Sequence, residues 1–123
     1  MKKTTLILAI MFLSIGMYAT NDIEVSLCDN KLSKNTVINR EALSRCNELT
    51  LNTKDWKIKS FSLGYLGEGN YIESTLSENT ISEKTANSLK KYTPSKIYIE
   101  QIIIVNRTGE EKRLESISLK ISD

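Results

Sequence analysis

The sequence contains no histidine and only two cysteines in 123 residues. Without histidine, the chain lacks the commonest general base and any Ser-His or Cys-His nucleophile pair. Two cysteines without histidine also make a poor zinc site. Internal repeats and low-complexity segments are absent too, which favours one compact domain. We expect no metal or cofactor, and paired carboxylates are the candidate catalytic groups that this composition leaves open.

The first 19 residues have the layout of a secretory signal peptide. Two lysines precede an apolar run from Leu6 to about Ile15, and small residues follow near Ala19. This run is shorter than the roughly 20 residues that span a bilayer. We expect cleavage after Ala19, a single mature domain over 20–123 with no membrane span, and export to the periplasm or beyond. An uncleaved membrane anchor is the alternative.

Cleavage would also remove the positive charge of the chain. Lys and Arg number 17 against 15 Asp and Glu, and the loss of the two N-terminal lysines leaves 15 of each, a net charge of 0. Nucleic-acid binding rests on neutralisation of phosphates by basic side chains. The mature domain is therefore not expected to bind nucleic acid.

The two cysteines, Cys28 and Cys46, predict one disulfide, because exported proteins mature in an oxidising compartment. The bridge would close a loop of about 19 residues and contribute roughly 3 kcal/mol on chain-entropy grounds. Two separate buried thiols are the alternative.

Apolar alternation predicts a first strand at residues 22–27, followed by a polar loop over 29–36. Residues 39–46 predict a short helix with Asn39 as its N-cap, and the disulfide would then pin this helix to the end of the first strand. Residues 56–67 predict a second strand. Its apolar phase changes near Lys59–Ser60, through a β-bulge or a switch of buried face. A turn at "GEGN" and a returning strand at 71–76 follow.

Residues 80–92 predict an amphipathic helix. Thr80 and Glu83 have the spacing of a capping box. Pro94 ends the helix and favours an extended Thr93. One stripe at helical spacing is expected to face the core: Ile81, Thr85, Leu89 and Tyr92.

The segment "KIYIEQIIIVNRTGEEKRLESISLKI" (96–121) predicts a hairpin at the heart of the fold. One parity of its first strand is expected to face the core (Ile97, Ile99, Ile103 and Val105), and Ile102 and Ile104 make the other face apolar. After the turn, Leu114 is out of phase with Ile117, Leu119 and Ile121, which indicates a bulge or a switch of face. The expected fold is mainly β (α+β). It is an antiparallel, β-sandwich-like domain with one packed amphipathic helix and a short N-terminal helix.

Two sequence features bear on chemistry. Glu100 lies in the middle of a predicted strand, where a polar position on a half-exposed face is the ordinary interpretation and a buried functional acid is the alternative. The stretch "GEGN" is not a phosphate loop, because it lacks the Gly-Lys-Ser/Thr ending and lies between strands.

The segment Leu89–Ile121 resembles the C-terminal domain of the gliding-motility-associated GldM family, called PorM in oral anaerobes. The matching positions are Lys96–Glu100, Gly109 and the run of Arg113, Leu114, Ile117, Leu119 and Ile121. Upstream, Ile58–Asn70 resembles the strand of that domain that carries Ser-Phe and its following turn. The sequence departs from the family at residues 106–110, where the family turn has Pro-Asp-Gly, and in its cysteine pair.

This resemblance implies a β-rich periplasmic domain without enzymatic activity. In the parent family, the domain contacts ring proteins at the outer-membrane end of a type IX secretion and gliding complex. We therefore expect a protein–protein interaction module accessory to that machinery, with a protein partner in the cell envelope and no small-molecule substrate. A small exported inhibitor or immunity-type protein that binds a soluble hydrolase is the alternative.

Contacts with a partner are expected at exposed strand edges and at two loop tips. The first loop tip comprises Gly67, Glu68, Gly69 and Asn70, and the second comprises Thr108, Gly109, Glu110 and Glu111.

Overall fold

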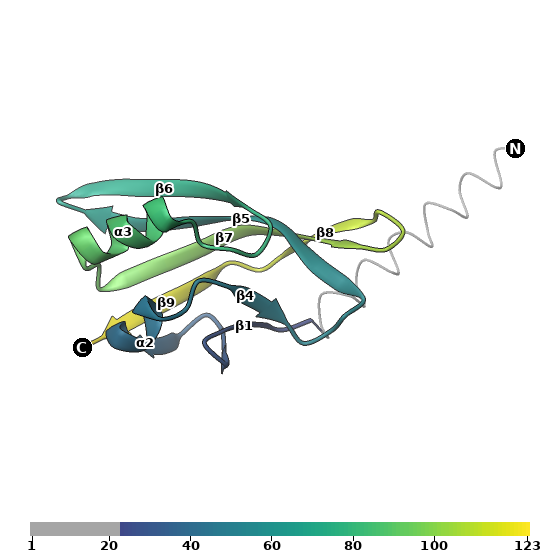
Figure 1. Ribbon diagram of the computed structural model, residues 1–123, viewed down its shortest axis with the longest axis horizontal. Helices are drawn as coiled ribbons and strands as arrows, with labels where there is room; N and C mark the ends of the chain where they lie inside the picture. Colours follow the sequence, from purple (N-terminus) through teal and green to yellow (C-terminus); the bar gives the residue numbers. More distant parts are fainter. Residues whose placement is uncertain (1–22) are drawn as a thin grey trace, which may run out of the picture.

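The computed structural model describes residues 23–123, so the predicted signal peptide lies outside the described residues (Figure 1). Along the chain the elements are β1 (Val25–Leu27), β2 (Asn30–Lys31), β3 (Thr36–Asn39), α2 (Arg40–Ser44), β4 (Leu49–Leu51), β5 (Trp56–Gly67), β6 (Asn70–Ser77), α3 (Glu83–Tyr92), β7 (Lys96–Asn106), β8 (Glu111–Leu114) and β9 (Ile117–Ser122).

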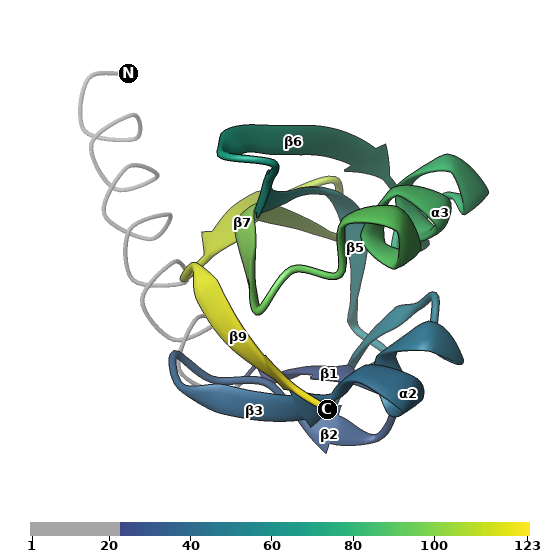
Figure 2. The same ribbon diagram turned by 90° about the vertical axis from the view of Figure 1, so that its left-hand side faces the viewer.

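These strands form two sheets. The small sheet has the order β2-β1-β4, and the large sheet has the order β3-β9-β7-β5-β6, with β8 also paired to β7. Figure 2 shows the large sheet curling from β6 at the top to β3 at the bottom, where the small sheet lies beside it. The β3–β9 pair is parallel, and the other pairs are antiparallel. The predicted class, mainly β and sandwich-like with two helices, is confirmed.

The core-facing residues of β5 and β7 change parity at the same level of the large sheet. Ile58 pairs with Ile104 at one end, and Leu63 pairs with Ile99 at the other. All four are buried, although the spacing between them is odd in both strands. Two register shifts lie in between, and Gln101 has a φ of 50° there. The bulge predicted near Lys59–Ser60 is confirmed, because an extra residue in each strand restores the common face.

The same change of parity continues into the last two strands. Leu114 of β8 pairs with Ile102, and Ile117 of β9 pairs with Ile99. The break between β8 and β9 therefore matches the bulge in β7. This arrangement confirms the switch that the out-of-phase Leu114 predicted.

The prediction of which residues face the core in the second half of β7 is wrong. Ile102 and Ile104 are fully buried, whereas Ile103 and Val105 are only partly buried. The prediction assumed that side chains alternate without interruption through Gln101, so that Ile103 and Val105 would face the core like Ile99. The positive φ of that residue instead turns the following side chains to the opposite faces.

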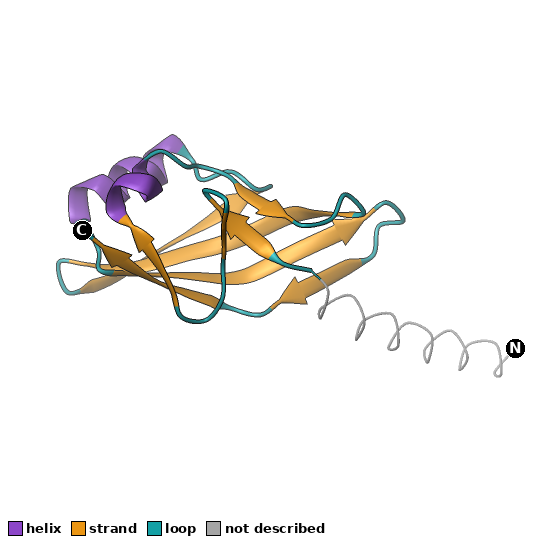
Figure 3. Cartoon of the chain, turned by 90° about the horizontal axis from the view of Figure 1, so that it is seen from below, coloured by secondary structure: helices purple, strands orange, loops and turns teal. Residues whose placement is uncertain are grey.

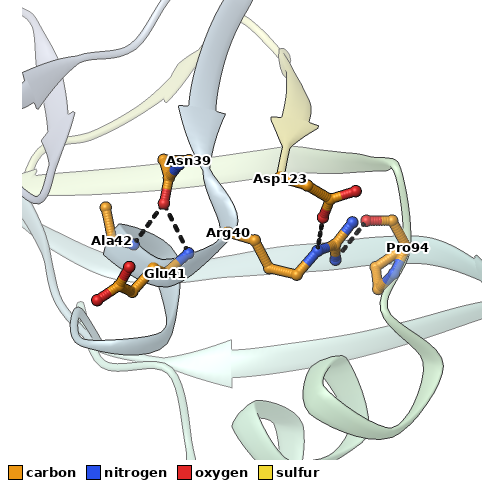
Figure 4. A network of polar contacts seen from close by, with 6 residues as sticks. All are labelled: Asn39, Arg40, Glu41, Ala42, Pro94 and Asp123. Atoms are coloured by element: carbon orange, nitrogen blue, oxygen red, sulfur yellow. Dashed lines mark hydrogen bonds and ion pairs between the residues drawn. The ribbon is translucent and has the colours of Figure 1, made fainter.

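The helix termini agree with the sequence at α2 and differ at α3. The Asn39 side chain accepts hydrogen bonds from the backbone N–H groups of Glu41 (2.8 Å) and Ala42 (3.3 Å), which confirms the predicted N-cap (Figure 4). For α3 the predicted capping box is wrong, because Ser82 is the N-cap and accepts the Thr85 N–H at 3.2 Å. Thr80 instead lies in an isolated bridge that precedes the helix.

The C-terminus of α3 also differs from the prediction. Thr93 is left-handed, with φ 41° and ψ 57°, rather than extended. Pro94 disfavours the right-handed helical conformation at Thr93 but leaves this alternative open. The left-handed residue lets its own N–H reach the Leu89 carbonyl at 2.9 Å and so closes the helix end.

The predicted stripe of α3 packs on the core. Thr85 is buried, and Leu89 and Tyr92 lie against the buried cluster. The Tyr65 hydroxyl is hydrogen-bonded to the Ser88 hydroxyl, and the Tyr65 and Tyr92 rings lie 6.3 Å apart. These contacts hold α3 against the C-terminal end of β5.

The sequence analysis missed three short strands. The predicted loop over 29–36 contains β2 and the start of β3, and β4 was not predicted. In β3, Ile38 is buried and its neighbour Val37 is 58% exposed, so two adjacent apolar residues face opposite ways. Each of the three strands has four residues or fewer, which leaves too short a window for alternation to be visible.

The predicted disulfide between Cys28 and Cys46 is present, with a Cα–Cα distance of 5.6 Å. Cys28 and Asp29 form the tight β1–β2 turn, and Cys46 follows α2. The bridge therefore pins α2 to the end of β1, as predicted. It joins the small sheet to the helix by a covalent bond.

Removal of the bridge should destabilise the domain. In a Cys28→Ser/Cys46→Ser variant, the free energy of unfolding should fall by about 2–4 kcal/mol, because the unfolded chain regains the entropy of the open loop. Denaturant unfolding of the domain measures this change. Wild-type protein in a reductant should unfold at the same midpoint as the variant, and equal stability of the oxidised wild type and the variant would contradict the prediction.

Candidate interaction surface on the outer face of β5, β6 and β7

The predicted loop at Gly67–Asn70 is the two-residue turn of the β5–β6 hairpin. Gly67 pairs with Asn70, and the two residues between them have positive φ, 52° at Glu68 and 82° at Gly69. Two central residues of positive φ define a type I′ turn, whose twist matches that of the flanking strands. This loop is therefore held in one conformation.

The second predicted loop, Thr108–Glu111, is the turn of the β7–β8 hairpin. The Asn106 side-chain oxygen accepts the N–H groups of Thr108 (3.1 Å) and Glu110 (2.9 Å), and Gly109 has a φ of 89°. Glu111 forms an ion pair with Lys59 of β5. This turn too is fixed by its own side chains.

The two loops lie at opposite ends of the large sheet. Trp56, at the start of β5, pairs with Asn106 beside the second loop, whereas Gly67 at the end of β5 begins the first loop. A strand of 12 residues separates them, which spans about 35 Å. Figure 1 shows the β5–β6 turn at the left end and the β7–β8 turn at the right. The structure therefore does not join the predicted loops into one surface.

The first loop adjoins a group of side chains on the face of the sheet that points away from the core. We call these residues the outer patch: Leu66, Tyr71, Glu73, Tyr98 and Glu100. Their strands meet at Gly64, which pairs with Glu73 on one side and with Tyr98 on the other. A Cβ at Gly64 would lie 1.9 Å from the Tyr71 hydroxyl oxygen, so the glycine makes room for the Tyr71 side chain.

Two aromatic rings and a carboxylate form the centre of the outer patch. The ring centroids of Tyr71 and Tyr98 lie 6.4 Å apart. The Tyr71 hydroxyl donates a hydrogen bond of 3.3 Å to Glu100 Oε1. Partial burial, and then the negative charge of Glu100, raise the pKa of Tyr71 above its usual 10.0. The Lys96 ammonium lies 5.8 Å from the centre of the Tyr98 ring.

Glu100 is half-buried and lies on the outer face rather than in the core. This position agrees with the ordinary interpretation of its sequence context. Its carboxylate contacts a phenol, and within residues 23–123 no group of metal-ligating side chains comes together.

The outer patch also has exposed apolar surface. Leu66 is 61% exposed and Tyr71 is 48% exposed, and they form a directly opposed pair on β5 and β6. Val37, at the other edge of the large sheet, is the third large hydrophobic side chain that the described part of the chain exposes. The sequence analysis missed the patch, although a glycine inside a strand is a signal of close approach.

A groove of about 1020 Å³ lies between α2 and α3, beside the C-terminus. Figure 3 shows the two helices at the same end of the molecule as the C-terminus. Its arginines already have partners. Arg40 bonds Asp123 at 2.6 Å and the Pro94 carbonyl at 3.1 Å (Figure 4), and Arg45 lies 3.5 Å from Glu41. The Arg40 contacts tie α2 to the end of β9.

Comparison with protein-family models finds none that matches the chain, and comparison with curated proteins finds no match either. In the described residues, neither helix has the length and apolar character that a membrane crossing requires.

Glu100→Gln should lower the pKa of Tyr71 towards 10.0 without reaching it, because partial burial of the phenol remains. An NMR titration of the tyrosine Cζ carbons measures this shift. The pKa of Tyr71 is raised by folding, so its stabilising contribution is complete below pH 10 and is lost as the pH rises through the folded-state value. Glu100→Gln should reduce this alkaline loss of stability.

The control is Glu115→Gln, which removes an exposed carboxylate of the β8–β9 connection. It should leave the titration of Tyr71 unchanged. An unaltered pKa in Glu100→Gln would contradict the close approach of the Glu100 carboxylate to the Tyr71 phenol.

Proposed function

We propose that the mature domain is a non-enzymatic periplasmic protein–protein interaction module, accessory to gliding motility and type IX secretion. The resemblance to the GldM C-terminal domain supports this role. The observation that carries the interaction is the exposed Leu66–Tyr71 pair, which adjoins the rigid Gly67–Asn70 turn.

Exposed apolar and aromatic side chains that gather on one face are a mark of interaction sites, whereas single exposed hydrophobic residues are ordinary. The outer patch has two tyrosines and a leucine on neighbouring strands. Because the strands and the turn already have a fixed conformation, little ordering entropy would oppose binding. The outer patch and the first loop are therefore the contact surface in this proposal.

The second candidate function is that of a small exported inhibitor or immunity-type protein. The observation in its favour is the Thr108–Glu111 turn, which Asn106 pre-organises at the far end of the sheet. A rigid, protruding loop of this kind suits insertion into the cleft of a soluble hydrolase.

Cross-linked pull-down of the tagged mature chain from native envelopes, read by mass spectrometry, tests the proposed function. Type IX secretion components should be enriched with the wild type. A Leu66→Thr/Tyr71→Thr variant should lose most of this enrichment, because it removes the exposed apolar pair. Val37→Thr is the matched control, since it removes an equally exposed side chain at the other edge of the sheet.

Enrichment of a single unrelated hydrolase would favour the inhibitor role, and replacement of Thr108–Glu111 should then abolish the complex. Equal recovery of type IX components by the wild type and the Leu66→Thr/Tyr71→Thr variant would show that the contact surface lies elsewhere.

A further inference from the structure

The strand β6 forms a free edge of the large sheet. It is the last strand in the order β3-β9-β7-β5-β6, and in residues 23–123 no strand pairs with its outer side. Figures 1 and 2 both show β6 at the margin of the molecule, with no other described element beyond it. A free edge presents unpaired N–H and C=O groups to a second polypeptide.

The hairpin geometry identifies these free groups. In a two-residue turn the flanking residues, here Gly67 and Asn70, form a hydrogen-bonded pair. Hydrogen-bonded and non-hydrogen-bonded pairs alternate along an antiparallel ladder. Ile72 and Ser74 therefore bond to β5, whereas the backbone groups of Tyr71, Glu73 and Thr75 point outwards. Each of these last three residues is exposed.

This edge has few of the usual protections against pairing, and Glu73 is the one charged residue of the strand. β6 has eight residues, without proline or lysine, and its register with β5 is continuous from Ser77 to Asn70. Natural edge strands are commonly short, bulged, or blocked by lysine or proline. The opposite edge strand, β3, is such a short strand, with four residues.

The edge is acidic rather than basic. Glu73 lies in β6, Glu68 lies in the turn before the strand and Glu78 directly follows it, and the chain has no lysine or arginine between Ser60 and Glu83. Glu100 adds a carboxylate on the outer face beside them. The charge that complements this edge is positive, and it would come from lysine or arginine side chains.

The aromatic rings of the outer patch favour the same side chains. Lys96 already lies over the Tyr98 ring, which shows that this ring accepts a cation. The neighbouring Tyr71 is half exposed and lies beside Glu100. A lysine or arginine that approaches along β6 would thus meet an aromatic ring together with a carboxylate.

A second copy of the chain fits this edge poorly. Two β6 strands that pair antiparallel along their full length around a two-fold axis place Glu73 opposite or diagonal to its symmetry mate. Like charges directly opposite in a sheet are destabilising. The edge therefore favours a different partner.

We propose that the β6 edge and the outer patch bind an extended segment of a partner protein, which adds a strand to the large sheet and places lysine or arginine at alternate positions over Tyr71, Glu73 and Glu100. This inference rests on the proposed interaction function and specifies its surface and the chemistry of its partner. Main-chain pairing would supply affinity, and the basic side chains would supply specificity.

The test uses a capped peptide with the length of β6, in which valine alternates with arginine. A matched peptide has glutamate in place of arginine. Amide hydrogen exchange of the mature domain is followed by NMR with each peptide. The arginine peptide should slow exchange at Tyr71, Glu73 and Thr75, while Ile72 and Ser74 are already protected by β5. A purely side-chain contact would not produce this alternate pattern.

Two variants test the charge contact and the main-chain hydrogen bonds separately. Glu73→Lys should weaken binding of the arginine peptide about tenfold, because one attractive charge contact becomes repulsive. Glu115→Lys, the same change at a remote exposed site, should have little effect. Thr75→Pro should weaken binding about fivefold, because it removes one outward N–H, and an edge position tolerates proline.

The proposal is overturned if the arginine peptide gives no alternate protection, if the glutamate peptide binds equally well, or if sedimentation shows that β6 pairs with a second copy instead. These outcomes are distinguishable from failure of the proposed function. If the pull-down still recovers type IX components, and Glu73→Lys and Thr75→Pro recover as much as wild type, the interaction role stands and the β6 edge is not its site. If no partner is recovered at all, the proposed function itself fails.

Discussion

The structure depends on a constraint that three strands share: β5, β7 and the β8–β9 segment must all reverse their side-chain parity at the same level. A reversal in one strand alone would turn its remaining apolar residues towards solvent. Here Ile58, Gln101 and the break after Leu114 mark the matching positions. The sheet therefore bends and twists there without losing its continuous buried face. The placement of Gly64, Tyr98 and Glu100 together on the opposite face follows from the same register.

Patterns in the sequence predicted the long elements well, because each carries its own signal. The Trp56–Gly67 strand shows its phase change directly, the "GEGN" turn has Gly69 at one of its two positions of positive φ, and Asn39 is a favourable N-cap. The class of the fold and the Cys28–Cys46 bridge followed from such local signals and from the expected compartment. The predictions failed at positions where the local sequence permits two conformations or two capping residues. Ser82 replaces Thr80 as a cap, and Thr93 takes a left-handed conformation rather than an extended one.

The candidate site was less accessible to sequence reasoning. The outer patch joins residues of three strands, and only the register brings Tyr71, Tyr98 and Glu100 together. The loop tips were recognisable as turns, but their distance from one another depends on the length of β5 and its pairing with β7. The short strands β3 and β4 could not be predicted, because their partners are distant in sequence and their length is below the period that a pattern needs.

The position of β9 has a consequence for the order in which the chain can fold. β9 follows every other described strand along the chain, yet it lies inside the large sheet between β3 and β7. Its parallel pairing with β3, like the Arg40–Asp123 contact, joins residues about 83 positions apart. β3 therefore has no sheet partner until the C-terminus is available, and such non-local contacts form slowly. The segment that contains β3 and α2 can therefore take its final place beside the large sheet only after β9 has formed.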